Sequence, residues 1–243
     1  IIPDVHGRKF WRKAVSLIKE LPADGKVIFL GDYLDPYDYE GIVSADAIVE
    51  LMAIVSFAKD NPGKVKLLLG NHDGNYIYKD CNSSRKDWSS YSEYNKFYAA
   101  NRDVFNIATE HIISGKKFLF THAGVHPLYL KDIGMSEESV NAETVNCLNY
   151  ETMLNTPGPI RSWICQENAG SPVWCDIVEF EGNNYGRKIN GYIQIVGHTQ
   201  LTDNPININD AIYDLDVRRP FMIDYNGNVC ELSGEIIPKT ITF

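Results

Sequence analysis

Five short motifs rich in Asp, Asn and His occur along this chain of 243 residues, and each one follows an apolar run. In order they are Pro3-Asp4-Val5-His6-Gly7, Gly31-Asp32-Tyr33-Leu34-Asp35, Gly70-Asn71-His72-Asp73, Thr121-His122-Ala123-Gly124 and Gly197-His198-Thr199. Such polar groups rarely gather at the ends of apolar strands unless a ligand requires them. We therefore predict a fold that brings these distant segments to one edge of a sheet, where they form one composite site.

The apolar runs alternate with helical patterns. Residues 26–30 and 64–69 are short apolar runs typical of buried strands, whereas residues 8–21 and 44–59 place apolar side chains at helical spacing. Strands that alternate with helices across short loops predict a mainly parallel sheet covered by helices. We expect one domain over residues 1–243, and Ile1-Ile2-Pro3 is typical of the last residues of a strand whose start is missing.

The remaining elements are predicted as follows. Residues 75–111 are expected to be helical and rich in aromatic side chains, and residues 112–120 to form a hairpin around Ser114-Gly115. Between residues 126 and 190 we expect helices with long irregular loops. Tyr192–Val196 is predicted to be a strand, and the dipeptide Asn226-Gly227 predicts a final hairpin.

Composition limits the partners. Hydrophobic residues make up 44% of the chain, which allows a sizeable core, and the net charge is -9. An acidic chain disfavours broad nucleic-acid binding, which depends on many Lys and Arg contacts to phosphates, so we expect no stable nucleic-acid partner. No apolar run approaches the roughly 18 residues that a membrane span needs, so we expect no membrane insertion.

The cysteines indicate a reducing compartment. Their number is odd, and no Cys-x-x-Cys pair occurs among Cys81, Cys147, Cys165, Cys175 and Cys230. We interpret them as reduced thiols of a cytoplasmic protein.

The motifs supply oxygen and nitrogen ligands without thiolate. Asp4 and His6 flank Val5, and alternate residues of an extended segment point to one side, so both can face one ion. Asp32 and Asp35 need separate roles, because one carboxylate can bridge two ions while the other orients a histidine. Further donors are the amide oxygen of Asn71 and the imidazoles of His122 and His198. This mixture suits two divalent ions such as Mn, Fe or Zn, and it does not choose among them.

Taken in this order, Asp-x-His-Gly, Gly-Asp-x-x-Asp, Gly-Asn-His-Asp, His-Ala-Gly and Gly-His-Thr resemble the motifs of the calcineurin-like metallophosphoesterase superfamily. Within it, the chain most resembles the phosphoprotein phosphatase branch, which includes bacterial diadenosine tetraphosphate hydrolases. The motifs cover residues 4–199. The resemblance implies an α/β fold, namely a metallophosphoesterase-type β-sandwich with a βαβαβ core and sheets flanked by helices.

The resemblance also implies roles for single residues. Asp4, His6 and Asp32 would hold the first ion, and Asp32 would bridge to a second ion. The ligands of this second ion would be completed by Asn71, His122 and His198. The implied reaction is hydrolysis of a phosphoester by a metal-bridging hydroxide. His72 would protonate the leaving oxygen, and Asp35 would orient the imidazole of His72.

The chain departs from the family pattern at the phosphate clamp. The protein phosphatases have an Arg after the second Asp of Gly-Asp-x-x-Asp, where this chain has Pro36. Our candidate for the clamp is Arg161, which precedes a Trp-containing segment, and Arg8 is a candidate for substrate contact. Gln200 stands where the nuclease and phosphodiesterase branches have a second metal-binding His, which favours the phosphatase-like branch.

Taken singly, each motif has a structural interpretation. Gly-Asp and Gly-Asn favour turns, and a lone histidine such as His122 is more often structural, but five concordant motifs favour a metal site. His126 is interpreted mainly as a capping or packing residue. The stripe Tyr91, Tyr94 and Tyr98 is interpreted as packing, whereas Tyr37 and Tyr39 are better placed to touch a substrate.

Three functions remain in competition. The first choice is a dinuclear metal-dependent hydrolase of phosphomonoesters, whose partner is a phosphorylated protein or small molecule. An alternative of the same class is a nucleotide or dinucleoside-polyphosphate hydrolase. An alternative of another class is a non-catalytic binding module of the same fold, but such a module should have lost ligands or the proton donor, and this chain retains them all. A helical His-Asp phosphohydrolase, suggested by His72-Asp73, conflicts with the apolar strand before it.

Overall fold

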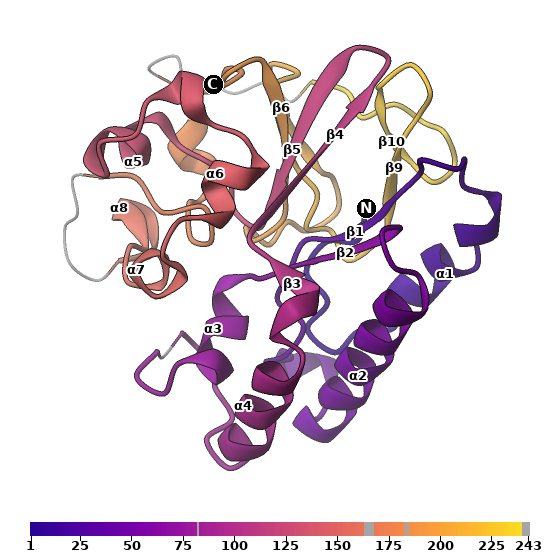
Figure 1. Cartoon of the computed structure of the whole chain (residues 1–243), viewed down its shortest axis with the longest axis vertical. Coiled ribbons are helices and arrows are strands. Elements are labelled where there is room, and N and C mark those ends of the chain that lie inside the picture. Colours follow the sequence, from indigo (N-terminus) through magenta and orange to yellow (C-terminus); the bar gives the residue numbers. More distant parts are fainter. Residues whose placement is uncertain (82, 163–167, 183–184, 240–243) are drawn as a thin grey trace.

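Two sheets that pack against each other form the centre of the molecule (Figure 1). The structure, a computed structural model, describes residues 1–81, 83–162, 168–182 and 185–239. The first sheet has the order β1-β2-β3 and is parallel, with strands Val27–Phe29, Val65–Leu68 and Phe105–Asn106. Ile2 extends it through a parallel bridge to Phe29.

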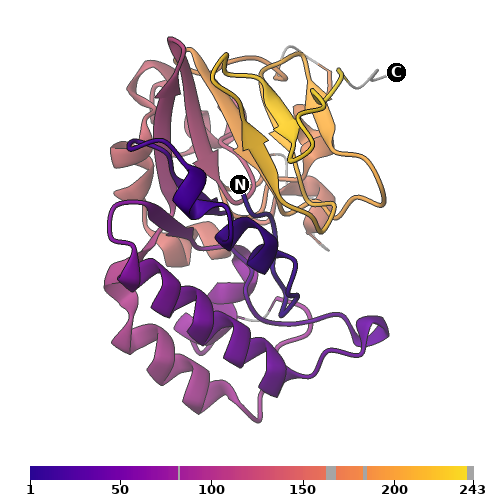
Figure 2. The same cartoon turned by 90° about the vertical axis from the view of Figure 1, so that its right-hand side faces the viewer.

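The second sheet has five strands in the order β4-β5-β6-β8-β7. The pairs β5–β6 and β6–β8 are parallel, whereas β4–β5 and β7–β8 are antiparallel. Its strands are Ala108–Ile113, Lys116–Thr121, Tyr192–Val196, Ile206–Ile208 and Ile212–Asp214 for β4 to β8. A separate antiparallel hairpin is formed by β9 (Phe221–Ile223) and β10 (Val229–Glu231), and it lies next to the N-terminus (Figure 2).

The helices are short except for α2. The α-helices α1 to α8 are Trp11–Val15, Ser44–Asp60, Asn71–Ile77, Tyr91–Ala100, Pro127–Asp132, Ala142–Asn146, Tyr150–Leu154 and Gly158–Arg161. The 3-10 helices η1 to η5 are Ile18–Glu20, Asp38–Glu40, Arg102–Val104, Glu137–Ser139 and Ile177–Phe180. In Figure 1, α2 and α4 lie below the three-stranded sheet, and α5 to α8 gather beside the five-stranded sheet.

Alternating side chains of β1 and β2 divide the core into two layers. Phe29 and Leu67 pack in the cluster that contains the inner face of α2, whereas Ile28 and Leu68 pack against the five-stranded sheet. Phe120 is one of the side chains that meet Ile28 and Leu68 there. Successive side chains of a strand point to opposite faces, so an uninterrupted apolar run suits a strand covered on both sides. The predicted α/β fold, with sheets flanked by helices, is confirmed.

This arrangement explains where the motifs meet. Parallel strands end at the same edge of a sheet, and the second and third motifs follow β1 and β2. The fourth and fifth motifs follow β5 and β6, which are parallel in the other sheet. The carboxyl edges of both sheets therefore deliver the motif residues to one place, as the alternation of the sequence predicts.

The predicted helix over residues 75–111 is wrong in two parts. The described residues of 78–81 and 83–90 form no helix, because polar side chains take up backbone donors: Asn75 Oδ1 accepts from Ser83 N at 2.8 Å, and Asp87 Oδ1 accepts from Ser89 N at 3.0 Å. Residues 105–113 contain β3 and β4, so the predicted hairpin is longer than residues 112–120. From Thr109 to Ile113 the side chains alternate between half-buried and exposed, which is the period of a strand and not of a helix.

Two further differences are smaller. The helix predicted over residues 8–21 is reduced to α1 and η1, and the Ser16 hydroxyl donates to Lys13 O at 2.7 Å after α1. The strands β7 and β8 were not predicted. They are joined by residues 209–211, in which Asn209 and Asp210 have φ values of 55° and 52° that are typical of a tight hairpin turn.

Among the described residues, no helix is both long and apolar enough to cross a membrane. The described cysteines, which are Cys81, Cys147, Cys175 and Cys230, form no disulfide. Cys165 lies outside the described residues.

Candidate metal centre

The first group of possible metal ligands joins the first two motifs. Asp4, His6 and Asp32 each place one ligand atom within 4.8 Å of the others, and all three are buried. His6 Nε2 lies 3.6 Å from Asp32 Oδ2. The two motifs are held together by backbone bonds, since His6 N donates to Asp32 O at 2.7 Å. Asp4 and His6 thus both bring their side chains to Asp32, although the φ of 43° at His6 shows that the segment is not extended there as the prediction assumed.

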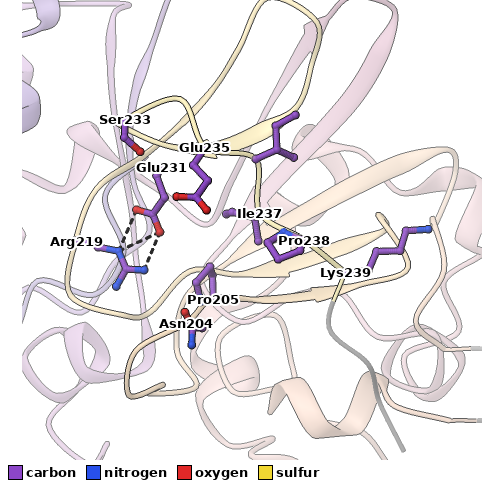
Figure 3. A pocket seen from close by; sticks show the side chains of 10 residues that line it. Asn204, Pro205, Arg219, Glu231, Ser233, Glu235, Ile237, Pro238 and Lys239 are labelled. Carbon is purple, nitrogen blue, oxygen red and sulfur yellow. Dashed lines mark hydrogen bonds and ion pairs between the residues drawn. The ribbon is translucent and has the colours of Figure 1, made fainter.

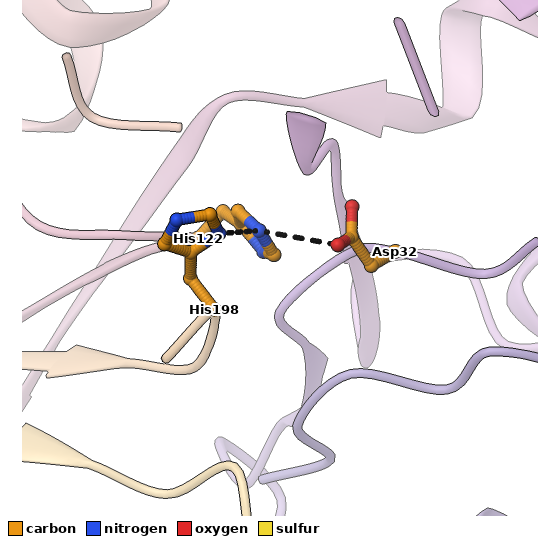
Figure 4. Close-up of side chains that lie close together, drawn as sticks. All are labelled: Asp32, His122 and His198. Atoms are coloured by element: carbon orange, nitrogen blue, oxygen red, sulfur yellow. Dashed lines mark hydrogen bonds and ion pairs between the residues drawn. The ribbon is translucent and has the colours of Figure 1, made fainter. Parts of the chain in front are cut away.

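The second group shares Asp32 with the first. Asp32, His122 and His198 again lie within 4.8 Å of one another, and Figure 4 shows the His122 imidazole between the other two side chains. His122 Nε2 lies 3.5 Å from Asp32 Oδ2 and 3.1 Å from His198 Nδ1. Asn71 Oδ1 joins the group at 3.0 Å from His122 Nε2. Five motifs therefore supply two adjoining groups with one carboxylate in common.

The protonation of two histidines leaves lone pairs facing the centre. His6 Nδ1 donates to Leu34 O at 2.7 Å, and His122 Nδ1 donates to Leu30 O at 2.9 Å, because a backbone carbonyl can only accept. Neutral imidazoles held in this way turn an unprotonated Nε2 toward the carboxylate of Asp32. Acceptor atoms that face one another without a donor fit a cation, and the carbonyl contacts are the usual outer support of metal-binding histidines.

The electrostatics of the centre fit a cation as well. Burial, and then the charge of Asp216, raises the pKa of Asp4 well above its usual range, and burial raises the pKa of Asp32 to about 7. Burial lowers the pKa values of His6 and His198 well below the usual range. Without a cation, the centre thus favours protonated carboxyl groups and neutral imidazoles. A bound divalent ion would reverse this preference for the carboxyl groups and keep the imidazoles neutral.

The backbone of the centre is strained. His6, Asp32, Asp35 and His198 have φ values of 43°, 51°, 59° and 73°, in the left-handed region that residues other than Gly rarely occupy. Such conformations cost free energy and gather at functional sites, where the surrounding fold holds them. Four of the predicted site residues therefore have a backbone conformation that packing alone does not favour.

Gly70 permits the approach of two ligands. A Cβ atom on this residue would collide with Asp32 Oδ1 and would lie 2.7 Å from His122 Cε1. The absence of a side chain at Gly70 is therefore a requirement of the centre itself.

His72 and Asp35 form a buried pair beside the first group. His72 Nδ1 donates to Asp35 Oδ2 at 2.8 Å, which leaves Nε2 as the nitrogen available for exchange of a proton with a substrate. Asp35 also accepts from Asn75 Nδ2 at 2.5 Å and from the hydroxyl of Tyr76. The His72 ring meets the His6 ring edge to face at 5.2 Å. The pair thus has the geometry that its predicted role as proton donor and orienting carboxylate requires.

The sequence analysis assigned no role to Asp73, the fourth residue of the third motif. Its buried carboxylate accepts from four donors: the backbone N of Gly70 at 2.7 Å, of Asp32 at 3.0 Å and of Tyr33 at 3.2 Å, and the Tyr98 hydroxyl at 2.6 Å. Asp73 therefore fixes the second motif against the third. Its position within the third motif was the feature of the sequence that could have identified it.

A second buried acid was also missed. Asp216 follows β8, and burial raises its pKa to about 6 while the charge of Arg8 opposes the shift. Asp216 Oδ1 and Arg8 Nη2 are both buried and have no hydrogen-bond partner among the described residues. No motif marks Asp216, because its place beside Asp4 results from the sheet topology.

The two predicted substrate-binding arginines lie near the centre but are paired with acids. Arg8 Nε donates to Glu40 Oε2 at 2.9 Å, and Arg8 Nη1 donates to Asp4 O at 3.2 Å. Arg161 Nη2 lies 2.7 Å from Asp176 Oδ2, and its charge lowers the pKa of His198 after the larger effect of burial. Their role in substrate binding stays a prediction.

A cavity of about 530 Å³ lies elsewhere, near the C-terminal end of the described chain (Figure 3). It is lined by residues that include Asn204, Pro205, Arg219 and Lys239, and none of its lining residues belongs to a motif. Its arginine is neutralised, since Arg219 Nη2 lies 2.7 Å from Glu231 Oε1. The cavity therefore shares nothing with the metal centre.

Solved structures share the fold at low sequence identity. The cold-active protein-tyrosine phosphatase of the psychrophile Shewanella sp. matches with a TM-score of 0.55 and 15% identity, over 94% of this chain and 75% of that one. Another structure of a cold-active protein tyrosine phosphatase matches with a TM-score of 0.56 and 16% identity, over 94% of this chain and 76% of that one.

The family model of calcineurin-like phosphoesterases matches residues 1–211. This match contains all five motifs and both groups of possible ligands. It confirms the resemblance to the superfamily, while the phosphoprotein phosphatase branch stays a prediction. The chain therefore belongs to the calcineurin-like phosphoesterase family and is a metal-dependent phosphoesterase, a hydrolase.

Proposed function

We propose that this chain is a dinuclear metal-dependent phosphatase that hydrolyses phosphomonoesters. The observation that carries the proposal is the sharing of Asp32 by two adjoining groups of ligands, Asp4-His6-Asp32 and Asp32-His122-His198. A carboxylate oxygen has more than one lone pair, so a carboxylate can belong to two ions at once. Asp32 is well held for this role, since its Oδ1 accepts from His72 N at 2.8 Å while its Oδ2 faces His6 of one group and His122 of the other.

The residues of the chain divide the work. Asp4, His6 and Asp32 would hold one ion, and Asn71, His122 and His198 would hold the other together with Asp32. When bound, such ions make water a nucleophile near neutral pH and neutralise the charge of a phosphoryl group. His72 would donate a proton from Nε2 to the leaving oxygen, and Asp35 orients the His72 ring through Nδ1.

Phosphoesters of alcohols and phenols, monoesters among them, fit the centre for a chemical reason. A leaving alcohol or phenol needs a proton, and His72 is a donor held in place at the edge of the first group. Phosphotyrosine is one such monoester, and the structural neighbours above are named for it. Phosphopeptides therefore belong in the first substrate test, together with small phosphomonoesters.

The test compares substrate classes on protein loaded with Mn, Fe or Zn. We expect p-nitrophenyl phosphate and phosphopeptides to be hydrolysed with a higher kcat/KM than bis-p-nitrophenyl phosphate or dinucleoside polyphosphates. The His72→Ala variant, prepared in the same way, controls for a contaminating phosphatase. A preference for dinucleoside polyphosphates would favour the nucleotide alternative. No turnover of any class by protein with a full metal complement would favour the non-catalytic binding module.

A further inference from the structure

Arg85 differs from the other arginines around the centre, because no carboxylate neutralises it. Arg8 pairs with Glu40 at 2.9 Å, and Arg161 pairs with Asp176 at 2.7 Å. In the part of the chain that the structure describes, Arg85 has no ion pair. A half-buried guanidinium without a counter-charge beside a metal centre is suited to an anionic ligand.

The guanidinium of Arg85 lies beside His72 and is held there by its Nε and by the Tyr37 ring. Its Nε donates to Asp35 O at 3.0 Å, and its Nη2 lies 3.4 Å from His72 Nε2. Its central carbon lies 3.7 Å from the centre of the Tyr37 ring. The centres of the Tyr37 and His6 rings are 5.2 Å apart in an edge-to-face arrangement. The Nη1 group makes no hydrogen bond to the described residues. The donors of Arg85 are therefore directed at the space next to His72 and His6.

The loop that carries Arg85 is fixed to α3, the helix that begins with Asn71 and His72. Ser83 N donates to Asn75 Oδ1 at 2.8 Å, and Asp87 N donates to the Tyr76 hydroxyl at 2.9 Å. Arg85 itself has a φ of 65°, which a residue other than Gly adopts only when its surroundings hold it. The loop therefore places Arg85 at a set distance from His72 at a cost in backbone strain.

We propose that Arg85, stacked on Tyr37, binds the free oxygens of the substrate phosphoryl group and so places the leaving oxygen against His72. This inference rests on the proposed phosphatase function. A guanidinium can donate two parallel hydrogen bonds to a phosphate. A monoester has more free oxygens and more negative charge than a diester, so Arg85 favours monoesters. Tyr37 is the positioning residue that keeps the guanidinium flat and near the centre.

The first experiment measures binding of inorganic phosphate to the Mn-loaded protein by calorimetry, together with its inhibition constant against p-nitrophenyl phosphate. Arg85→Gln should weaken phosphate binding by roughly 10- to 100-fold with metal content unchanged. Arg85→Lys keeps the charge but loses the paired donors, and should fall between Arg85→Gln and wild type. Arg187→Gln is the matched control, because Arg187 pairs with Glu137 at 2.7 Å on the surface. This control should bind phosphate as wild type does.

A second pair of variants tests the stacking of the Tyr37 ring on the guanidinium of Arg85. Tyr37→Phe keeps the ring under the guanidinium and should bind phosphate nearly as wild type does, whereas Tyr37→Ala should approach the loss seen for Arg85→Gln. The ratio of kcat/KM for a monoester to that for a diester should fall in both Arg85→Gln and Tyr37→Ala. Loss of a purely structural contact would lower both rates alike and leave this ratio unchanged.

The outcomes separate this inference from the proposed function. Wild type that hydrolyses monoesters, with Arg85→Gln binding phosphate equally well, would overturn the role of Arg85 alone. The same holds if Arg161→Gln weakens phosphate binding and Arg85→Gln does not, because the anion would then lie at Arg161. Wild type that hydrolyses no phosphoester and binds no phosphate with its metals in place would overturn both proposals.

Discussion

At the scale of single residues, the centre depends on which nitrogen of each histidine carries its proton. His6 and His122 donate hydrogen bonds from Nδ1 to the carbonyl oxygens of Leu34 and Leu30, and their Nε2 atoms face Asp32. His72 instead donates a hydrogen bond from Nδ1 to the carboxylate of Asp35. A carbonyl partner at Nδ1 fixes Nε2 as the nitrogen that faces a metal, and burial lowers the pKa of His6, whereas a carboxylate partner adds a negative charge that stabilises an imidazolium. The group that accepts the hydrogen bond from Nδ1 therefore distinguishes the proposed metal ligands from the proposed proton donor.

This difference predicts the behaviour of His72→Ala. The variant should keep its metal content and lose turnover by roughly 10²- to 10⁴-fold, because the proton donor is removed while the ligands remain. The loss should be larger for an alkyl phosphate, whose leaving group needs the proton, than for p-nitrophenyl phosphate. Metal analysis and kcat for both substrates check this. Equal losses on the two substrates would show that His72 is not the acid.

Residue type and position were enough to predict part of the centre. Asp4, His6 and Asp32 follow apolar runs directly, so their place at a strand end could be inferred. Arg85 could not be predicted, because it belongs to a loop whose position depends on bonds to Asn75 and Tyr76. The expected helix over residues 78–90 also concealed that loop.

At the scale of elements, the turn between β2 and α3 has little room. Gly70→Ala would drive a Cβ atom into Asp32 Oδ1, so we expect metal affinity to fall by roughly 10- to 100-fold. The control is Gly134→Ala, at a φ of 69° with nothing within 4 Å of the added Cβ. This control should lose stability through backbone strain and keep its metal affinity. Titration with Mn checks both variants, and equal affinities in Gly70→Ala and wild type would contradict the prediction.

The start of α5 depends on a neutral histidine. His126 Nδ1 accepts from Leu128 N at 3.1 Å, and Nε2 lies 3.0 Å from Glu179 O, which can only accept. Burial lowers the pKa of His126 from 6.5 to about 4, although the Glu179 carbonyl and the charge of Glu137 oppose the shift. As the pH falls, His126 is therefore protonated at a higher pH in the unfolded chain than in the folded one. The stability contributed by the neutral form is present above the unfolded pKa.

Stability should accordingly fall by up to about 3 kcal/mol through His126 as the pH drops from about 6.5 to about 4. The variant His126→Asn keeps a capping oxygen and does not titrate, so its free energy of unfolding should depend less on pH over this window. Urea unfolding of both proteins at several pH values compares the two slopes. Parallel slopes would show that His126 does not titrate in this way.

Strands were easier to predict than helices in this chain. The apolar runs before Gly31 and Gly70 needed no tertiary information, because strands covered on both faces are apolar throughout. The polar residues between Tyr78 and Ser90 bond to the backbone in ways that only the folded chain defines. The Asn209-Asp210 turn carried a local hairpin signal for β7 and β8, which the sequence analysis did not use.

At the scale of the whole molecule, the centre joins the two sheets. Asp32 and Asn71 follow strands of the three-stranded sheet, and His122 and His198 follow strands of the five-stranded sheet. The core between the sheets sets the distance between these edges. A pair of ions sharing Asp32 would therefore connect both halves of the fold, and the central claim of this account is that Asp32 belongs to both ions.

Metal content measured after equilibration with Mn tests this claim most directly. Mass spectrometry of the dialysed protein should find two ions per chain in wild type. In Asp32→Asn both sites should weaken together, because the shared carboxylate is lost from each group of ligands. One ion per chain in metal-replete wild type, or the loss of one ion alone in Asp32→Asn, would contradict a dinuclear centre bridged by Asp32.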